Sequence, residues 1–231
     1  MKYTVYPEVF ELDEEIEFGI IIGTNMKVSD TTEEDYQRLM AAEDDFRSRE
    51  SGGDIRLIPS VARYRNVLTK AGINPNKFIA SVEAMLKRVA KGSHLPRINS
   101  LVDLCNAVSI EEGLSLGGHD LKDIHYDLEV RYSKAGDKFL PFGETQWEEV
   151  LPGELVFTAG DEVQTRKWVW RQSEYGKVTG ETRDVFFQIA GFKGFDSLPN
   201  AMDKIRDLVI NRFGGDCKTF IVNKTNPAID F

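Results

Sequence analysis

The sequence predicts an α+β fold in which a strand-rich mixed sheet, formed mainly by the second half of the chain, has helices packed against it. Apolar residues recur at helical spacing through most of residues 31–113. Short segments rich in Val, Phe, Trp and Tyr, separated by Gly and Pro, dominate residues 126–190. No linker, internal repeat or low-complexity tract interrupts the 231 residues, so we expect a single domain over 1–231.

The first half is expected to begin with two strands and to continue with helices. Alternation over 2–10 and the continuous apolar run FGIIIG over 18–23 predict the strands. Capping residues, apolar periodicity and glycine stops predict helices over 31–49, 59–72, 75–90 and 96–113. The helix over 75–90 has the clearest amphipathic pattern of the four.

The second half is expected to consist of strands and one helix. Segments of high β propensity lie at 126–132, 153–158, 166–172, 184–190 and 219–223. A helix over 199–212 is expected to end at Gly214-Gly215. Alternation along 166–172 would place Trp168 and Trp170 on one face of the sheet, either as stacking groups for a base or aromatic amino acid or as core residues.

The charge distribution suggests a surface that faces a polyanion. The net charge is −9, which argues against general coating of nucleic acid, yet residues 61–100 contain eight Lys and Arg and one acidic residue. A solvated helix face would have the same composition, so both interpretations stay open. The candidate RNA-binding residues in or beside this segment are Arg63, Arg65, Lys87, Arg88, Lys91 and Arg97.

Several classes of protein are disfavoured by the sequence. It contains neither a Walker A motif nor G-x-G-x-x-G, and no G-x-S-x-G elbow of a serine hydrolase. No apolar run is long enough for a membrane span, and the N-terminus lacks the order of a signal peptide. The chain has two cysteines, Cys105 and Cys217, which are far apart in the sequence; this favours a reducing compartment. Their spacing does not match that of zinc ligands. We therefore expect a cytoplasmic protein without metal or other cofactor.

Residues 95–120 form the run that is richest in candidate functional groups. Asn99, Asp103 and Asn106 share one side of the helix expected after Pro96, and Gly117-Gly118 is expected to form a flexible turn before His119-Asp120. Amide groups on a rigid helix can bind a ligand amine, hydroxyl or ribose. They can equally cap the helix and fix nearby loops.

The same run resembles a known family. The family's pattern is approximately R/L-P-x-N-x-x-V-D-x-x-N, followed by a short turn and a D-L pair. The matching residues of this chain are LPRIN (95–99), LVDLCN (101–106) and Asp120-Leu121. This pattern resembles the B3/B4 domain, the editing module of the bacterial phenylalanyl-tRNA synthetase beta chain, which also occurs as a free-standing protein. The resemblance extends over about 65–192. It implies hydrolysis, without a metal, of an ester between tyrosine and phenylalanine tRNA.

The resemblance also implies which residues would surround the substrate. Asn106, His119 and Gln188 would lie around the aminoacyl ester and position water. Cys105 replaces a Thr of the family, and Gly117 stands at the position of its turn His, with His119 two residues later. Gln188 replaces a Glu that contacts the tyrosine hydroxyl, and Trp170-Arg171 fall near a small Ala-Gly site. The candidate substrate-binding residues are Asn99, Cys105, Gly117, Gly118, Trp170 and Arg171.

Three functions remain open on this basis. The first is a free-standing deacylase of mischarged aminoacyl-tRNA, and the second is a module that binds the tRNA end or an amino acid without hydrolysis. The third is a small-molecule enzyme in which Trp170-Arg171 recognise a carboxylate. Under the first two, the partner is tRNA or its aminoacylated 3′ end, with no membrane and no DNA. The chain is too short for a complete tRNA ligase.

Overall fold

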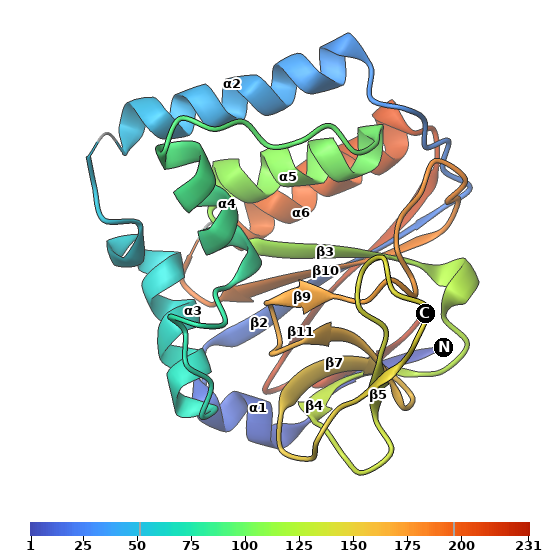
Figure 1. Cartoon of the computed structure of the whole chain (residues 1–231). Coiled ribbons are helices and arrows are strands. Elements are labelled where there is room, and N and C mark those ends of the chain that lie inside the picture. Colours follow the sequence, from blue (N-terminus) through green and yellow to red (C-terminus); the bar gives the residue numbers. More distant parts are fainter. Residues whose placement is uncertain (51, 196) are drawn as a thin grey trace.

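The strands of the protein form two sheets, and the helices lie mainly on one side of them (Figure 1). The computed structural model describes residues 1–50, 52–195 and 197–231. The helical elements are α1 (Pro7–Leu12), α2 (Glu33–Arg49), η1 (Ile55–Leu57), α3 (Pro59–Lys70), α4 (Ser81–Ala90), α5 (Ser100–Glu112), η2 (Leu121–Asp123), α6 (Ser197–Asp207) and η3 (Leu208–Arg212). The strands are β1 (Lys2–Val5), β2 (Ile16–Thr24), β3 (Ser115–Asp120), β4 (Leu128–Tyr132), β5 (Lys138–Phe139), β6 (Glu148–Glu149), β7 (Leu155–Ala159), β8 (Glu162–Arg166), β9 (Arg171–Gln172), β10 (Val185–Phe192), β11 (Asp216–Asn223) and β12 (Ala228–Asp230).

The smaller sheet has four antiparallel strands in the order β11-β2-β10-β3. Every residue of the central strand β10 is buried, which explains its nearly continuous apolar sequence. Strand β3 pairs with β10 alone in this sheet and so forms one of its edges. This edge is where the candidate site lies.

Helices α5 and α6 lie against one face of the smaller sheet, and α2 covers α5 from outside (Figure 1). Two glycines of the sheet allow α6 to approach closely. A Cβ atom on Gly19 would lie 2.7 Å from the sulfur of Met202, and one on Gly191 would lie 2.9 Å from Leu198. A side chain at either position would therefore have to displace Met202 or Leu198, and glycine avoids this.

The larger sheet follows the order β12-β1-β4-β7-β8-β5-β6, with β9 paired to β8. Aromatic side chains fill the space between the two sheets: Tyr3 lies 6.2 Å from Phe157 and 5.4 Å from Phe186, centroid to centroid. Strand β1 pairs with β12, which brings both ends of the chain together (Figure 1). In the described part of the chain, no helix combines the length and apolar character that a membrane span requires.

The α+β class is confirmed, but five local predictions are wrong. The strand expected over 2–10 ends at Val5 and is followed by helix α1, and the helix expected over 75–90 begins only at Ser81. The helix expected from Pro96 begins only at Ser100, because the Asn99 side chain accepts a hydrogen bond from the Val102 amide and caps it. The Gly117-Gly118 turn is instead part of strand β3, because β10 supplies a partner strand. The strand expected over 166–172 is interrupted by a turn at Lys167 and Trp168, so the two tryptophans do not share a sheet face.

Candidate functional site

A cleft surrounds the free edge of β3 and has a chamber on each side of the smaller sheet. Successive residues of a strand point to opposite faces. Ser115, Gly117 and His119 accordingly line the chamber toward the larger sheet, and Gly118 lines the chamber toward α5. Both chambers are lined by Leu116, Gly117 and Gln172, so they meet at the strand edge.

The apolar chamber, between α5 and β3, has a volume of about 460 Å³. This is within the range of small-molecule sites. Its apolar lining comprises Ile98, Leu101, Val102, Cys105, Leu116, Phe142, Val178 and Phe187, and its polar side chains are Asn106, Gln172 and Lys177. Phe142 is 49% exposed, so an aromatic face remains available at this surface.

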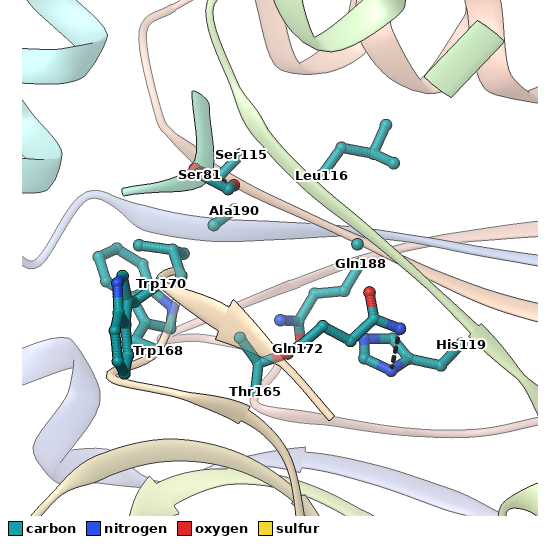
Figure 2. A pocket seen from close by; sticks show the side chains of 12 residues that line it. Ser81, Ser115, Leu116, His119, Thr165, Trp168, Trp170, Gln172, Gln188 and Ala190 are labelled. Carbon is teal, nitrogen blue, oxygen red and sulfur yellow. Dashed lines mark hydrogen bonds between the residues drawn. The ribbon is translucent and has the colours of Figure 1, made fainter. Parts of the chain in front are cut away.

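The polar chamber, between β3 and the turn after β8, is smaller, at about 80 Å³ (Figure 2). Its hydrogen-bonding side chains are Ser81, Ser115, His119, Thr165, Gln172 and Gln188, together with the indoles of Trp168 and Trp170. Figure 2 shows the two tryptophans on one side of the chamber and His119 with Gln172 on the other. No carboxylate of the described residues lines either chamber.

His119 is a neutral group at physiological pH. It is 1% exposed, and burial lowers the pKa of its imidazole to about 4, with Gln164 partly opposing that effect. Its ring packs edge-on against Phe157 at 5.0 Å. The Gln172 amide nitrogen lies 3.4 Å from Nδ1, which favours a proton on Nε2. His119 can therefore donate and accept hydrogen bonds, but it is a weak base.

Gln188 lines the polar chamber, and only the oxygen of its side-chain amide is hydrogen-bonded to the described residues. Its Oε1 accepts a hydrogen bond of 2.8 Å from the hydroxyl of Tyr3, and burial raises the pKa of that phenol well above its ordinary value. The side-chain NH₂ of Gln188 makes no hydrogen bond to the described residues. A ligand acceptor in the chamber can therefore bind this donor.

The edge of β3 presents backbone donors where the chambers meet. Residues along an antiparallel edge strand point their N–H and C=O groups alternately toward the partner strand and away from it. The Asp120 amide donates to Gly176 O (2.9 Å) and Gly118 O accepts from Gln172 Nε2 (2.8 Å), so even-numbered residues of β3 point away from β10. The N–H groups of Leu116 and Gly118 therefore point into the cleft.

The substrate-binding candidates on α5 divide into two groups. Cys105 and Asn106 line the apolar chamber, opposite Gly117 and Gly118. Burial raises the pKa of the Cys105 thiol to about 12, so it is protonated at neutral pH. Asn99 is outside the chamber lining: its oxygen caps α5 and its nitrogen lies 3.4 Å from Val178 O. Asp103 likewise fixes the backbone of Ile98.

The sequence predicts that Asn106, His119 and Gln188 surround one substrate, but strand β3 lies between Asn106 and the other two residues. His119 and Gln188 lie together in the polar chamber, whereas Asn106 lies in the apolar chamber. Gly117, which has no side chain, separates them. Trp170 lines the polar chamber and packs on Phe78, while exposed Arg171 lies 4.7 Å from the Trp170 ring and lines neither chamber.

The basic candidates also separate into two groups. Arg63 binds Asp13, Arg65 binds Glu83 and Arg97 binds Glu33, so their charges are paired. Lys87, Arg88 and Lys91 line one open groove of about 560 Å³ along α4, the α4 groove. Lys87 also contacts Glu83 at 2.6 Å. The N-terminal residue of α4, Ser81, lines the polar chamber, so the same helix reaches both features.

Sequence reasoning did not select several residues of the cleft. Ser81, Thr165, Gln172, Phe142 and Lys177 come from separate segments, and no spacing in the sequence connects them. The sequence indicates Trp168 only as one of two neighbouring indoles. A Lys-Trp sequence gives no signal for the left-handed turn that places this indole in the chamber.

The chain is similar in sequence to a family of domains and to a subunit of a tRNA ligase. Residues 63–198, more than half of the chain, match the sequence profile of the family described as "B3/4 domain". The phenylalanine–tRNA ligase beta subunit of Chromobacterium violaceum is 29% identical over 130 residues, which are 56% of this chain and 16% of that protein. An N-terminal fragment of the phenylalanyl-tRNA synthetase beta subunit from Pyrococcus horikoshii aligns with a TM-score of 0.44 and 11% identity, over 95% of this chain and 54% of that one.

In the described residues, no group of three or more His, Cys, Asp and Glu side chains is placed to bind a metal ion.

Proposed function

Because this chain belongs to the B3/4 domain family, we propose that it binds the aminoacylated 3′ end of a tRNA and hydrolyses the ester bond of the amino acid. The observation that carries this proposal is the junction of an apolar and a polar chamber at the backbone donors of Leu116 and Gly118. The similarity to a phenylalanine–tRNA ligase subunit supports tRNA as the class of partner.

The two chambers suit the two parts of an aminoacyl-adenosine. The larger apolar chamber takes the terminal adenosine, whose base can stack on Phe142. The polar chamber takes the amino acid, whose polar atoms meet Gln188, His119 and Ser81. The ester then lies across the edge of β3, where neither Gly117 nor Gly118 has a side chain to obstruct it.

The groups at this junction suit hydrolysis by water without a covalent enzyme intermediate. Water attacks the ester carbonyl, and the negative charge that develops on its oxygen is stabilised by the N–H groups of Leu116 and Gly118. The bond to the ribose oxygen then breaks, and the products are the free amino acid and a free 3′-terminal hydroxyl. Cys105 is protonated and cannot attack as a thiolate. Much of the acceleration therefore comes from orientation.

The α4 groove would hold the phosphates that precede the terminal adenosine. Ser81 and Arg88 are seven residues apart on α4, which is about 10 Å along a helix axis. A chain that enters the chambers near Ser81 can thus place its backbone beside Lys87, Arg88 and Lys91. Arg63, Arg65 and Arg97 would contribute little, because each is paired with a carboxylate and none lines this groove. Lys87 lines the groove and shares the single negative charge of Glu83 with Arg65.

One observation favours binding without hydrolysis as a second candidate. No carboxylate of the described residues lines the cleft, and His119 is a weak base, so proton removal from water has little assistance. On this alternative the site binds the aminoacylated 3′ end of the tRNA and does not hydrolyse the ester.

Release of radiolabelled amino acid from a panel of mischarged tRNAs tests the proposal. We expect release from at least one aminoacyl-tRNA. Replacing His119, which lines the chamber for the amino acid, or Asn106, which lines the chamber for the adenosine, by Ala should lower the rate by about 10-fold or more, because orientation of the ester is lost. Unchanged rates in both variants would exclude these residues from the reaction. Saturable binding with no release from any member of the panel would establish the second candidate instead.

A further inference from the structure

The indole N–H of Trp168 is a buried donor without a partner. Trp168 is 1% exposed and lines the polar chamber. Its Nε1 is one of four buried side-chain nitrogen or oxygen atoms that find no hydrogen-bond partner among the described residues. Buried polar groups in native proteins are nearly always hydrogen-bonded, because an unmade bond is destabilising. This exception lies in the wall of the proposed amino-acid chamber.

The backbone that presents this indole is strained. Lys167 and Trp168 have φ values of +49° and +64°, a region that non-glycine residues rarely adopt. The Val169 amide donates to Lys167 O at 2.7 Å, which closes a γ-turn with a positive central φ. Conformations of this kind persist only where the surrounding structure enforces them, and they concentrate at functional sites.

The surrounding structure holds this turn from several sides. Glu154 accepts hydrogen bonds from the Lys167 amide (3.2 Å) and from Arg166 Nε (2.9 Å) and Nη2 (2.7 Å), and it also pairs with the Lys167 ammonium. The Trp168 amide donates to Leu155 O at 2.8 Å, and Val169 O accepts from the Ser81 amide at 2.8 Å. The indole is therefore fixed in the chamber wall with its N–H unused.

The polar chamber contains hydrogen-bonding groups but no ionised side chain among the described residues. Ser81, Thr165, Gln172 and Gln188 are uncharged, and His119 is neutral. The nearest cation on the turn, Lys167, is paired with Glu154. A charged amino-acid side chain would lose its hydration here without gaining a counterion, which is unfavourable.

We propose that Trp168 Nε1–H is a specificity-determining donor that selects aminoacyl groups with an uncharged side chain bearing an oxygen acceptor, such as a hydroxyl. This inference rests on the proposed function of the cleft. An aminoacyl group with an acceptor completes the hydrogen bond of the indole, whereas its apolar isostere leaves that donor buried and unpaired. Charged side chains are rejected by desolvation.

Paired substrates test this selection directly. The specificity constant kcat/KM is measured for seryl against alanyl and threonyl against valyl esters, each pair on the same tRNA. We expect the wild-type protein to prefer the hydroxyl member of a pair by about 10- to 100-fold. Trp168→Phe, which removes the N–H and keeps an aromatic ring, should reduce that ratio to near one. Trp147→Phe, in the surface loop between β5 and β6, is the matched control and should keep it.

A binding measurement separates failure of this inference from failure of the proposed hydrolysis. The probes are 3′-seryl- and 3′-alanyl-amino-3′-deoxyadenosine, whose amide bond resists cleavage. The three indole signals of the protein are assigned by Trp→Phe variants. We expect the seryl probe to bind more tightly and to shift the Trp168 indole proton downfield.

Each outcome decides at least one of the two claims. A shift of the Trp168 signal without turnover of any ester would retain the inference and overturn hydrolysis. Equal affinity of the two probes with an unmoved Trp168 signal, or a hydroxyl preference that survives in Trp168→Phe, would overturn the inference. Absence of binding by both probes would overturn the inference and the proposed function together.

Discussion

At the scale of single residues, His119 is a neutral hydrogen-bonding group, and this has a consequence for stability. Its folded-state pKa of about 4 is below the value of about 6.5 for an unfolded histidine. As pH falls from 6.5 to 4, the unfolded state therefore binds a proton that the folded state does not. The contribution of His119 to stability is complete above pH 6.5 and decreases as pH falls through this window.

We predict that His119→Gln weakens the acid dependence of stability. The wild-type protein should lose about 3 kcal/mol more unfolding free energy between pH 7 and pH 4 than the variant, since each pKa unit corresponds to about 1.4 kcal/mol. Urea unfolding at a series of pH values measures this difference. His125→Gln, at an exposed histidine, should follow the wild-type curve. Parallel curves for the wild type and His119→Gln would contradict the burial of a neutral imidazole.

Residue types were predicted from the sequence better than residue partners. The excess of positive charge over 61–100 is present, but the N-terminal 50 residues supply carboxylates that pair with two of its arginines, at Asp13 and Glu33. Those pairs join segments more than 45 residues apart, so no local pattern reveals them. Of the basic candidates, Lys87, Arg88 and Lys91 line one groove along α4.

At the scale of elements, β3 shows why the site could be predicted only in part. The polar run was correctly identified as a helix followed by glycines, and the apolar chamber does lie between them. The glycine pair lies in an edge strand because it pairs with β10, which is some 70 residues later in the sequence. The division of the chambers by β3 follows from that pairing, so it could not be read from local sequence.

Helix α4 provides a prediction on tRNA binding. Replacing Lys87, Arg88 and Lys91 together by Gln should lower the slope of log affinity against log salt by about 2, because each lost phosphate contact removes about 0.7 for a single strand. Filter binding of uncharged tRNA from low to moderate salt measures the slope. Lys193, Lys218 and Lys224, exposed on other elements, form a matched triple control with the same change in charge. A similar loss in both triple variants would indicate a general charge effect and exclude the α4 groove as the binding surface.

At the scale of the whole molecule, the α+β class could be predicted, whereas the two-sheet arrangement could not. Strand β1 pairs in parallel with β4 and antiparallel with β12, and β2 lies between β10 and β11. Segments from both ends of the chain thus complete sheets whose other strands come from the middle. The hydrophobic pattern of a segment predicts that it is a buried strand, but it does not predict which other strands it pairs with.

This arrangement predicts that the family-matched segment does not fold alone. A fragment of residues 63–198 would lack β2, so the apolar strand β10 would lose one of its two partners, and it would lack α2 over α5. We expect poor dispersion of amide signals and no cooperative thermal transition for the fragment, with both present in the 231-residue chain. A cooperative transition in the fragment would show that the single domain expected over 1–231 is divisible.

The central claim, that an aminoacyl ester lies across the edge of β3, is tested most directly by filling that edge. Gly118 has a β-strand conformation, and a Cβ atom there would lie 3.5 Å from Phe187 and Val185, an ordinary contact, so the first carbon of a side chain fits at this position. A cooperative thermal transition of Gly118→Val checks that the variant is folded. Gly180→Ala, where a Cβ meets nothing within 4 Å, is the control. We predict that Gly118→Val loses release of amino acid from aminoacyl-tRNA by at least about 100-fold while Gly180→Ala keeps the wild-type rate. A folded Gly118→Val protein that releases amino acid at the wild-type rate would contradict the account.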